Sequence, residues 1–252
     1  MNLKCTVRYE GTGFAGWQTQ PGERTVQGVL EEGLAVIAQR PVRIHGAGRT
    51  DAGVHALAQV FSCQWPRADL EVDRVRRSLS RMLGPAIRVE AIERVDEAFH
   101  ARKSAVSKRY AYTLHVGREP DPFACRYAWT VPPGVDLEKA AEQLRRIEGT
   151  HDFAGFQGSK SSVTDTARTI HSARLLEGGV IGPRDAGGLY RIELHGDGFL
   201  YKMARNVVGA VVDIARGRLP ASALDERLAA PAPYLGHTAP AHGLTLLAVL
   251  YE

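Results

Sequence analysis

The order of apolar periodicities constrains the fold most, because the same order occurs twice along the chain. In the first half, apolar residues alternate as in strands or recur with helical spacing in the order strand, helix, strand, strand, helix, strand. This order is typical of a ferredoxin-like unit, β-α-β-β-α-β. The expected elements are a strand over 3–9, a helix over 26–39, strands over 42–45 and 56–65, a helix over 72–82 and a strand over 87–95.

The second half repeats this order, although its residues show no similarity to those of the first half. Its expected elements are a strand over 110–116, a helix over 137–147, strands over 168–177 and 189–196, helices over 200–216 and 221–229, and a strand over 244–251. The sequence therefore predicts an α+β fold of two ferredoxin-like units, whose antiparallel sheets lie side by side around a central cleft. A boundary near residues 102–108 gives units at 1–104 and 105–252.

The segment Gly46–His55, between two expected strands of the first unit, is the candidate site. It holds three glycines in eight positions, and it carries Arg49 and Asp51. Glycines allow a tight turn with positive φ, and rigid loops between strands are where catalytic groups tend to lie. The same composition is also typical of a plain hairpin turn, in which Asp51 caps its own turn and Arg49 is solvated.

Further motifs, in a fixed order along the chain, favour the catalytic interpretation. The run Gly48–Ala56, followed by Gln59-Val60, resembles the catalytic segment of the TruA family of tRNA pseudouridine synthases. The chain departs from the family pattern at Glu10, where Asp is usual, and at Ala204, where Val is usual. The other segments that resemble the family are Tyr9–Gln20, Thr25–Gln27, Lys108–Tyr112, Gly198–Gly209 and Ala241–Leu246.

The resemblance implies an enzyme that isomerises uridine to pseudouridine at positions 38, 39 and 40 of the tRNA anticodon stem-loop. It assigns Asp51 as the nucleophile and Arg205 as the cation that keeps this carboxylate ionised in a dry cleft. It assigns Arg49 to the space that the flipped base leaves in the RNA. Tyr110 matches the tyrosine that packs against the target uracil, whereas spacing alone favours a core position, because Tyr110 shares a strand face with Tyr112.

The reaction breaks the bond between uracil N1 and ribose C1′ and rejoins the base through C5, without any redox change. We therefore expect no cofactor. Attack at C6, attack at C1′ and elimination at C2′ all stay open as chemical routes. The cysteines Cys5, Cys63 and Cys125 form no CxxC pair, and the histidines form no metal-binding pair, so a reduced cytoplasm without a structural metal is expected.

Composition agrees with an RNA partner. Of the 32 basic residues, 26 are arginines, which suit phosphates and stack on bases, although a GC-rich genome produces the same bias. The expected partners are the tRNA anticodon arm and a second copy of the chain in a symmetric homodimer; no apolar stretch is long enough to span a membrane. The basic residues expected around the cleft are Lys103, Lys108, Arg109, Lys160, Arg168 and Arg174.

Two other functions compete with this interpretation. A non-catalytic RNA-binding protein could use RRM-like units, but it has no need for the Asp51 turn, and no RNP1-like aromatic pattern is present. A glycosidase needs a second acid at the site, and none lies near Asp51 in sequence. In the loop Gly13–Gln20, Trp17 either contacts the RNA or packs in the core, and the sequence leaves this open.

Overall fold

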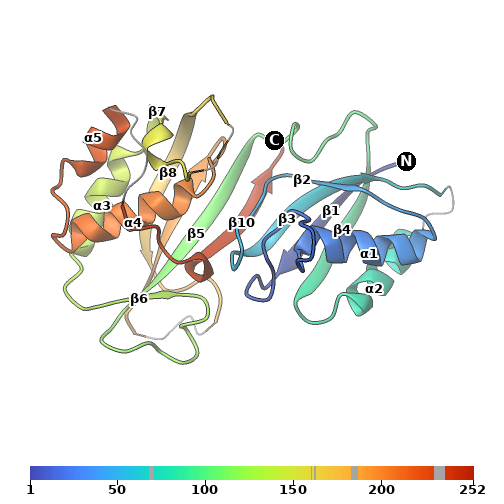
Figure 1. The fold of residues 1–252 in the computed structure, drawn as a ribbon, viewed down its shortest axis with the longest axis horizontal. Coiled ribbons are helices and arrows are strands. Elements are labelled where there is room, and N and C mark those ends of the chain that lie inside the picture. Colours follow the sequence, from blue (N-terminus) through green and yellow to red (C-terminus); the bar gives the residue numbers. More distant parts are fainter. Residues whose placement is uncertain (68–70, 160, 162, 183–186, 230–235) are drawn as a thin grey trace. The chain divides into compact units, whose positions relative to one another are not determined.

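The chain of this computed structural model divides into two compact units (Figure 1). Residues 1–252 are described except 68–70, 160, 162, 183–186 and 230–235. Unit 1 comprises Met1–Val106 and Leu246–Glu252, and unit 2 comprises Ser107–Thr245. Both units combine helices and strands, which confirms the α+β class. Within the described ranges, no helix is both long enough and apolar enough to cross a membrane.

Unit 1 contains the elements that its apolar periodicity predicts, with bounds that shift by one or two residues. Lys4, Thr6 and Arg8 are more exposed than the alternating residues Leu3, Cys5, Val7 and Tyr9, which are buried. This alternation gives the first strand one core face. The elements are β1 (Asn2–Tyr9), α1 (Val26–Ala38), β2 (Ile44–Gly46), β3 (His55–Gln64), α2 (Val72–Met82) and β4 (Ile87–Val95).

The sheet of unit 1 is antiparallel where its register is given. The strand order runs β4-β1-β3-β10, and β2, which lies off this path, pairs with β3. Strand β10 is Leu244–Leu250, of which all but the first two residues belong to unit 1. Cys5 of β1 lies opposite Phe61 of β3 and opposite Ile92 of β4. Helices α1 and α2 contact each other, and α2 packs beside β4 (Figure 1).

The two ends of helix α1 are set by the residues that flank it, Thr25 and Gln39. Thr25 has extended backbone angles, and its Oγ1 accepts a hydrogen bond of 3.2 Å from the Gly28 N–H, which is a typical N-cap. Gln39 adopts the left-handed conformation, with φ of 57°, and ends the helix. Leu30 and Leu34 are buried, so the apolar face predicted from their spacing is the face that packs.

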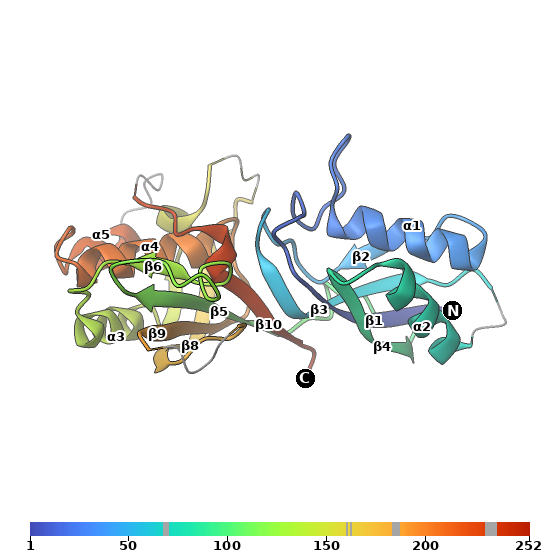
Figure 2. The same cartoon turned by 90° about the horizontal axis from the view of Figure 1, so that it is seen from below.

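Unit 2 contains the elements predicted for the second half except the last strand, β10, most of which belongs to unit 1, and it has two further short strands. Its strand order runs β5-β9-β8-β7, and β6 pairs parallel with β5. Helices α3, α4 and α5 contact one another and lie together (Figure 2). The elements are β5 (Ser107–Val116), β6 (Trp129–Val131), α3 (Leu137–Arg146), β7 (Gly149–Asp152), β8 (Ala167–Glu177), β9 (Leu189–Gly196), α4 (Met203–Ala215) and α5 (Ala223–Ala229).

Helix α4 begins later than the predicted start at residue 200. Lys202 takes the left-handed conformation, with φ of 59°, and therefore cannot continue a helix from the residues before it. Helix α4 starts at Met203, and all but one of its residues from there to Ala215 are buried. The exception is Arg205, which is half-buried on the first turn.

Candidate functional site

Asp51 lies on a tight turn between β2 and β3. The Val54 N–H donates to the Asp51 carbonyl at 3.1 Å, and Gly53 has φ of 81°, as this kind of turn requires. Asp51 is half-buried, Arg49 is exposed, and Thr50 between them is buried. The predicted glycine turn is therefore confirmed, and it presents an arginine and a carboxylate two residues apart.

Buried hydrogen bonds anchor the residue before Asp51. The Thr50 hydroxyl and the Tyr9 hydroxyl form a hydrogen bond of 2.8 Å. The Thr50 carbonyl accepts a hydrogen bond of 3.0 Å from the Trp17 N–H. Burial raises the pKa of Tyr9 to about 12, although its hydrogen bonds with Thr50 and Gln59 partly oppose this rise. These contacts join the Asp51 turn to the end of β1 and to the loop that follows it.

Two glycines let the loop after β1 press directly on the backbone of the Asp51 turn. A Cβ at Gly16, where φ is 92°, would lie 2.8 Å from the Thr50 carbonyl oxygen. A Cβ at Gly11 would lie only 2.0 Å from the Val54 carbonyl oxygen. Side chains cannot occupy these gaps without moving the backbone, so the loop and the turn form one packed substructure.

His55 joins the same substructure from the start of β3. Its side chain is fully buried, and its Nδ1 accepts a hydrogen bond of 3.0 Å from the Gly11 N–H. Because Nδ1 uses its lone pair for this bond, the ring is neutral with its proton on Nε2. The 3.5 Å contact between Nδ1 and the Glu10 carboxylate is therefore not an ion pair.

The aromatic residues of the loop Gly13–Gln20 pack in the core. Trp17 is 2% exposed, and its ring lies 6.1 Å from that of Tyr9 and 6.5 Å from that of Phe61, measured between centroids. Phe14 is buried beneath the guanidinium of Arg24, at 4.4 Å. Of the two alternatives that the sequence left open for Trp17, the structure shows core packing.

Sequence reasoning missed the residues that position the turn. Gln59 is fully buried, and its Nε2 donates to the Gly48 carbonyl at 3.1 Å, which fixes the start of the loop that carries Asp51. Tyr9 and Thr50 anchor its centre. All three residues lie inside the quoted motifs, but spacing gives no sign that their polar groups meet.

In unit 2, the first turn of α4 holds Arg205 in place. The Arg205 Nε donates to the Ala239 carbonyl at 2.7 Å, and the Ala239 N–H donates back to the Arg205 carbonyl at 3.2 Å. The neighbouring Asn206 is buried, where it donates to the Phe156 carbonyl at 2.8 Å and accepts from the Thr238 hydroxyl at 2.7 Å. The Ala239 carbonyl therefore holds the Arg205 guanidinium, and the bonds of Asn206 hold the helical turn that carries it.

The charge of Arg205 acts on two neighbouring titratable groups. Burial lowers the pKa of His242, and the positive charge of Arg205 lowers it further. Burial raises the pKa of Tyr112 well above its usual range, and Arg205 opposes this rise. The Tyr112 hydroxyl donates to the Pro240 carbonyl at 2.8 Å, so Tyr112 is a core residue of this unit.

Tyr110 lies in the same strand as Tyr112 and is also nearly buried. It is 7% exposed, and its ring meets that of Phe199 edge-on, with centroids 5.0 Å apart and planes at 76°. Phe199 belongs to the motif that leads into α4. Tyr110 therefore packs against the motif Gly198–Gly209, to which Arg205 also belongs.

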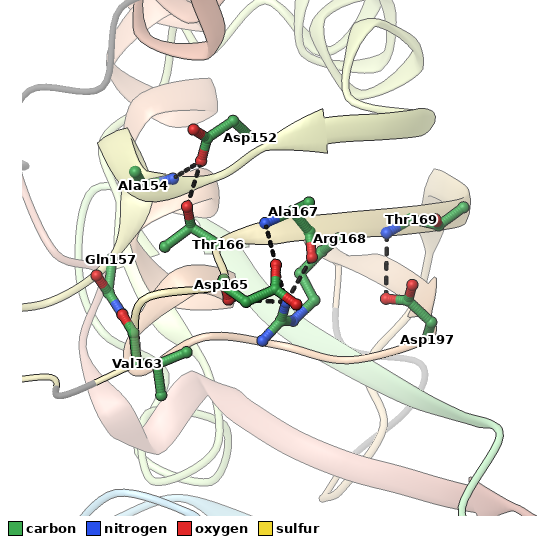
Figure 3. A network of polar contacts seen from close by, with 10 residues as sticks. All are labelled: Asp152, Ala154, Gln157, Val163, Asp165, Thr166, Ala167, Arg168, Thr169 and Asp197. Atoms are coloured by element: carbon green, nitrogen blue, oxygen red, sulfur yellow. Dashed lines mark hydrogen bonds and ion pairs between the residues drawn. The ribbon is translucent and has the colours of Figure 1, made fainter.

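The basic residues expected to meet phosphates differ in their exposure and in the hydrogen bonds that they make within the protein. Lys103, Arg109 and Arg174 are exposed, and Lys160 lies outside the described residues. Arg168, near the start of β8, bends back toward the residues before it, where its Nη1 donates to the Asp165 carbonyl at 3.1 Å and to the Ala167 carbonyl (Figure 3). Arg168 therefore stabilises the start of β8 in this structure.

The polar network around Arg168 also fixes the turn after β9. The Thr169 N–H donates to the Asp197 carboxylate, and the Asp197 N–H donates to the Thr169 carbonyl, both at 3.1 Å (Figure 3). Nearby, Asp152 accepts hydrogen bonds from the Thr166 hydroxyl and the Ala154 N–H, which lower its pKa. Because Asp197 directly precedes Gly198, this network positions the motif that carries Arg205.

Comparison with known proteins identifies the family. A family model described as tRNA pseudouridine synthase matches residues 6–102 and 144–252. The chain belongs to the tRNA pseudouridine synthase family. Its relatives include proteins named tRNA pseudouridine synthase A from Bacillus licheniformis and Bacillus subtilis, each 38% identical over the full length of both chains. A relative of the same name from Geobacillus kaustophilus is 39% identical over 99% of this chain and 94% of its own.

Family membership establishes the class of reaction. The chain is an enzyme that isomerises uridine in tRNA, which favours the catalytic interpretation over the non-catalytic RNA-binding protein. Arg49, Asp51 and Arg205 lie inside the residues that the family model matches, whereas Tyr110 lies between the two matched ranges. Among solved structures, one named Crystal Structure of a Cbf5-Nop10-Gar1 Complex aligns with 96% of this chain and 57% of its own, at 10% identity and a TM-score of 0.37, which is too weak a likeness for any conclusion.

Proposed function

We propose that Asp51 is the nucleophile with which this enzyme converts uridines 38, 39 and 40 of the tRNA anticodon stem-loop to pseudouridine. The observation that carries the proposal is the anchored turn: a half-buried carboxylate follows Thr50, whose side chain and carbonyl are both held by buried groups. A fixed carboxylate loses little freedom on reaching the transition state, which is what nucleophilic catalysis requires.

The reaction itself needs no external reagent. The bond between N1 and C1′ breaks, a bond between C5 and C1′ forms, N1 gains a proton, and C5 loses one. Atoms and electrons balance without oxidation or reduction. A carboxylate that bonds transiently to the sugar or the base is sufficient to carry this exchange, and we therefore propose that the enzyme works without a cofactor.

We propose supporting roles for three other residues. Arg205, whose guanidinium is held by Ala239, supplies the positive charge that keeps the catalytic carboxylate ionised. Arg49 is exposed next to Asp51, so its side chain is available to fill the space of a flipped base. Tyr110 is 7% exposed, so it would meet the uracil only through the edge that Phe199 leaves uncovered.

We further propose that both units are ferredoxin-like, with functional domains at 1–104 and 105–252. In unit 1, the antiparallel order β4-β1-β3 with β2 beyond β3 supports this, because each helix then connects two strands that flank a third. We also propose a cytoplasmic homodimer with twofold symmetry, the commonest assembly among soluble oligomers.

The proposal is tested by mapping pseudouridine in defined tRNA transcripts. Three unmodified transcripts, each with a single uridine at position 38, 39 or 40, are incubated with the enzyme, next to a fourth transcript that lacks uridine at all three. We expect pseudouridine at the one available position in each of the first three and none in the fourth. Modification of the fourth transcript at another position would contradict the assignment.

A further inference from the structure

A group of arginines surrounds a hollow in unit 1 that the reaction at Asp51 does not use. The hollow has a volume of about 390 Å³ and lies between α2 and the start of β4. Arg76, Arg77, Arg81 and Arg88 line it, together with Ser80, and none of the described residues in its lining is acidic. Helix α2 itself buries only Val75 and Leu79, so its remaining surface is free to carry these charges.

The arginines are incompletely neutralised within the protein. Arg76 pairs with Asp73 at 3.7 Å, and Arg88 shares Glu90, at 3.2 Å, with Arg8. In the described part of the chain, Arg77 and Arg81 have no ion-pair partner. Arg77 and Arg81 are four residues apart on the exposed side of α2, so their like charges lie close together and repel each other. An anion in the hollow would relieve this repulsion.

The hollow lies at the same end of the sheet as the Asp51 turn. Ile87, which also lines it, is in register with Tyr9 of β1, and Tyr9 is in register with Ala56 of β3. The Tyr9 hydroxyl contacts Thr50, the residue before Asp51. The hollow is thus two strand spacings from β3, roughly 10 Å across the sheet. An RNA backbone bound beside β3 would have to extend about this far to meet these arginines.

We propose that this hollow, the α2–β4 arginine site, binds backbone phosphates of the tRNA next to the stem on which Asp51 acts. The inference rests on the proposed function for its substrate. Arginine forks hold phosphate oxygens in pairs, and four of them around one open hollow match a run of phosphates better than a single ion. The Ser80 hydroxyl, which has no hydrogen-bond partner among the described residues, adds a neutral donor to the lining.

The test measures binding of unmodified full-length tRNA by the intact protein over a range of salt concentrations. The test variant is Arg77→Glu/Arg81→Glu. The control is Arg40→Glu/Arg145→Glu, which changes the net charge equally at two exposed arginines outside the hollow. We expect the test variant to bind tRNA at least about tenfold more weakly at low salt. The slope of its log binding constant against log salt concentration should be shallower by the contribution of about two phosphate contacts. The control should change the dissociation constant less than about threefold.

Two further variants separate a phosphate site from a structural effect. Arg77→Lys/Arg81→Lys keeps the charge and should keep most of the affinity, whereas Arg77→Gln/Arg81→Gln should lose affinity without introducing repulsion. The rate at saturating tRNA should be unchanged in all four variants, because none touches the Asp51 turn. Equal weakening and equal salt dependence in the test variant and the control would overturn the proposal.

The binding comparison needs no turnover, so it stands apart from the test of the proposed function. A wild-type enzyme that makes no pseudouridine at positions 38–40 would refute the assigned positions. It would leave the comparison of the arginine variants to decide the phosphate site. Conversely, full activity with arginine variants that bind like the control would refute only the phosphate site.

Discussion

Replacing Gly11 with alanine tests whether the loop after β1 places Asp51. The added Cβ would lie 2.0 Å from the oxygen and 2.6 Å from the carbon of the Val54 carbonyl, whereas ordinary contacts begin near 3.4 Å. Both atoms belong to the backbone, so the turn itself must move, by about 1.4 Å if it absorbs the whole overlap. Val54 donates its N–H to the Asp51 carbonyl, so the displacement reaches the carboxylate.

Misplacement of a catalytic group by about 1 Å costs about 100-fold in rate, so we expect kcat/KM of Gly11→Ala to fall by about this factor. Overpacking should also lower the free energy of unfolding by about 1–3 kcal/mol. Gly13→Ala is the matched control in the same loop, because the nearest atom to its added Cβ is Arg24 Nη1, at an ordinary 3.5 Å.

Both variants are compared with the wild type by single-turnover pseudouridine formation and by urea unfolding. Gly13→Ala should stay within about twofold of the wild type in rate. A folded Gly11→Ala enzyme with a rate within about threefold of Gly13→Ala would refute the reasoning. In that case, the close approach of Gly11 would not determine where Asp51 lies.

Three other predictions follow from the two units. Burial raises the pKa of Tyr9 to about 12, so the unfolded chain loses this proton first and stability falls as pH rises from 10 to 12. Urea unfolding should show that this fall is larger in the wild type than in Tyr9→Phe by about 2–3 kcal/mol, and parallel falls would contradict it. Arg205→Ala should raise the pKa of His242 in an NMR titration, because the charge of Arg205 lowers it. The same variant should lower kcat by about 100-fold or more. An unchanged titration of His242 would show that the charge of Arg205 does not act on this histidine. Sedimentation should show a dimer at micromolar concentration, and a fully active species of 27.5 kDa would exclude it.

The sequence predicts best those elements whose residues alternate or recur over many positions. The strand β1 and the helix α1 were found at their expected places because burial on one face dictates both patterns. The strands β6 and β7 were missed because three or four residues such as Gly149–Asp152 are too few to show a period. The start of α4 was misplaced because the left-handed conformation of Lys202 leaves no mark on the apolar spacing.

The candidate site shows the same division. The glycine turn and its carboxylate could be predicted because glycines that are close together in the sequence indicate a tight turn without any knowledge of distant contacts. The hydrogen bond between Tyr9 and Thr50 joins residues that are 41 positions apart in the sequence. The hydrogen bond between Thr169 and Asp197 joins residues that are 28 positions apart. Such polar contacts arise only after the strands are in register, and no spacing rule predicts them.

The role of Asp51 is tested most directly by the release of tritium from tRNA labelled at C5 of uridine, because C5 must lose its hydrogen when pseudouridine forms. Asp51→Asn keeps the size of the side chain and removes its charge, and Asp225→Asn is the control at a surface ion pair with Arg146. We expect Asp51→Asn to release less than about 1% of the wild-type tritium while it binds tRNA within about tenfold of the wild type. The control should match the wild type. Tritium release above about 1% by Asp51→Asn would remove Asp51 from the role of nucleophile.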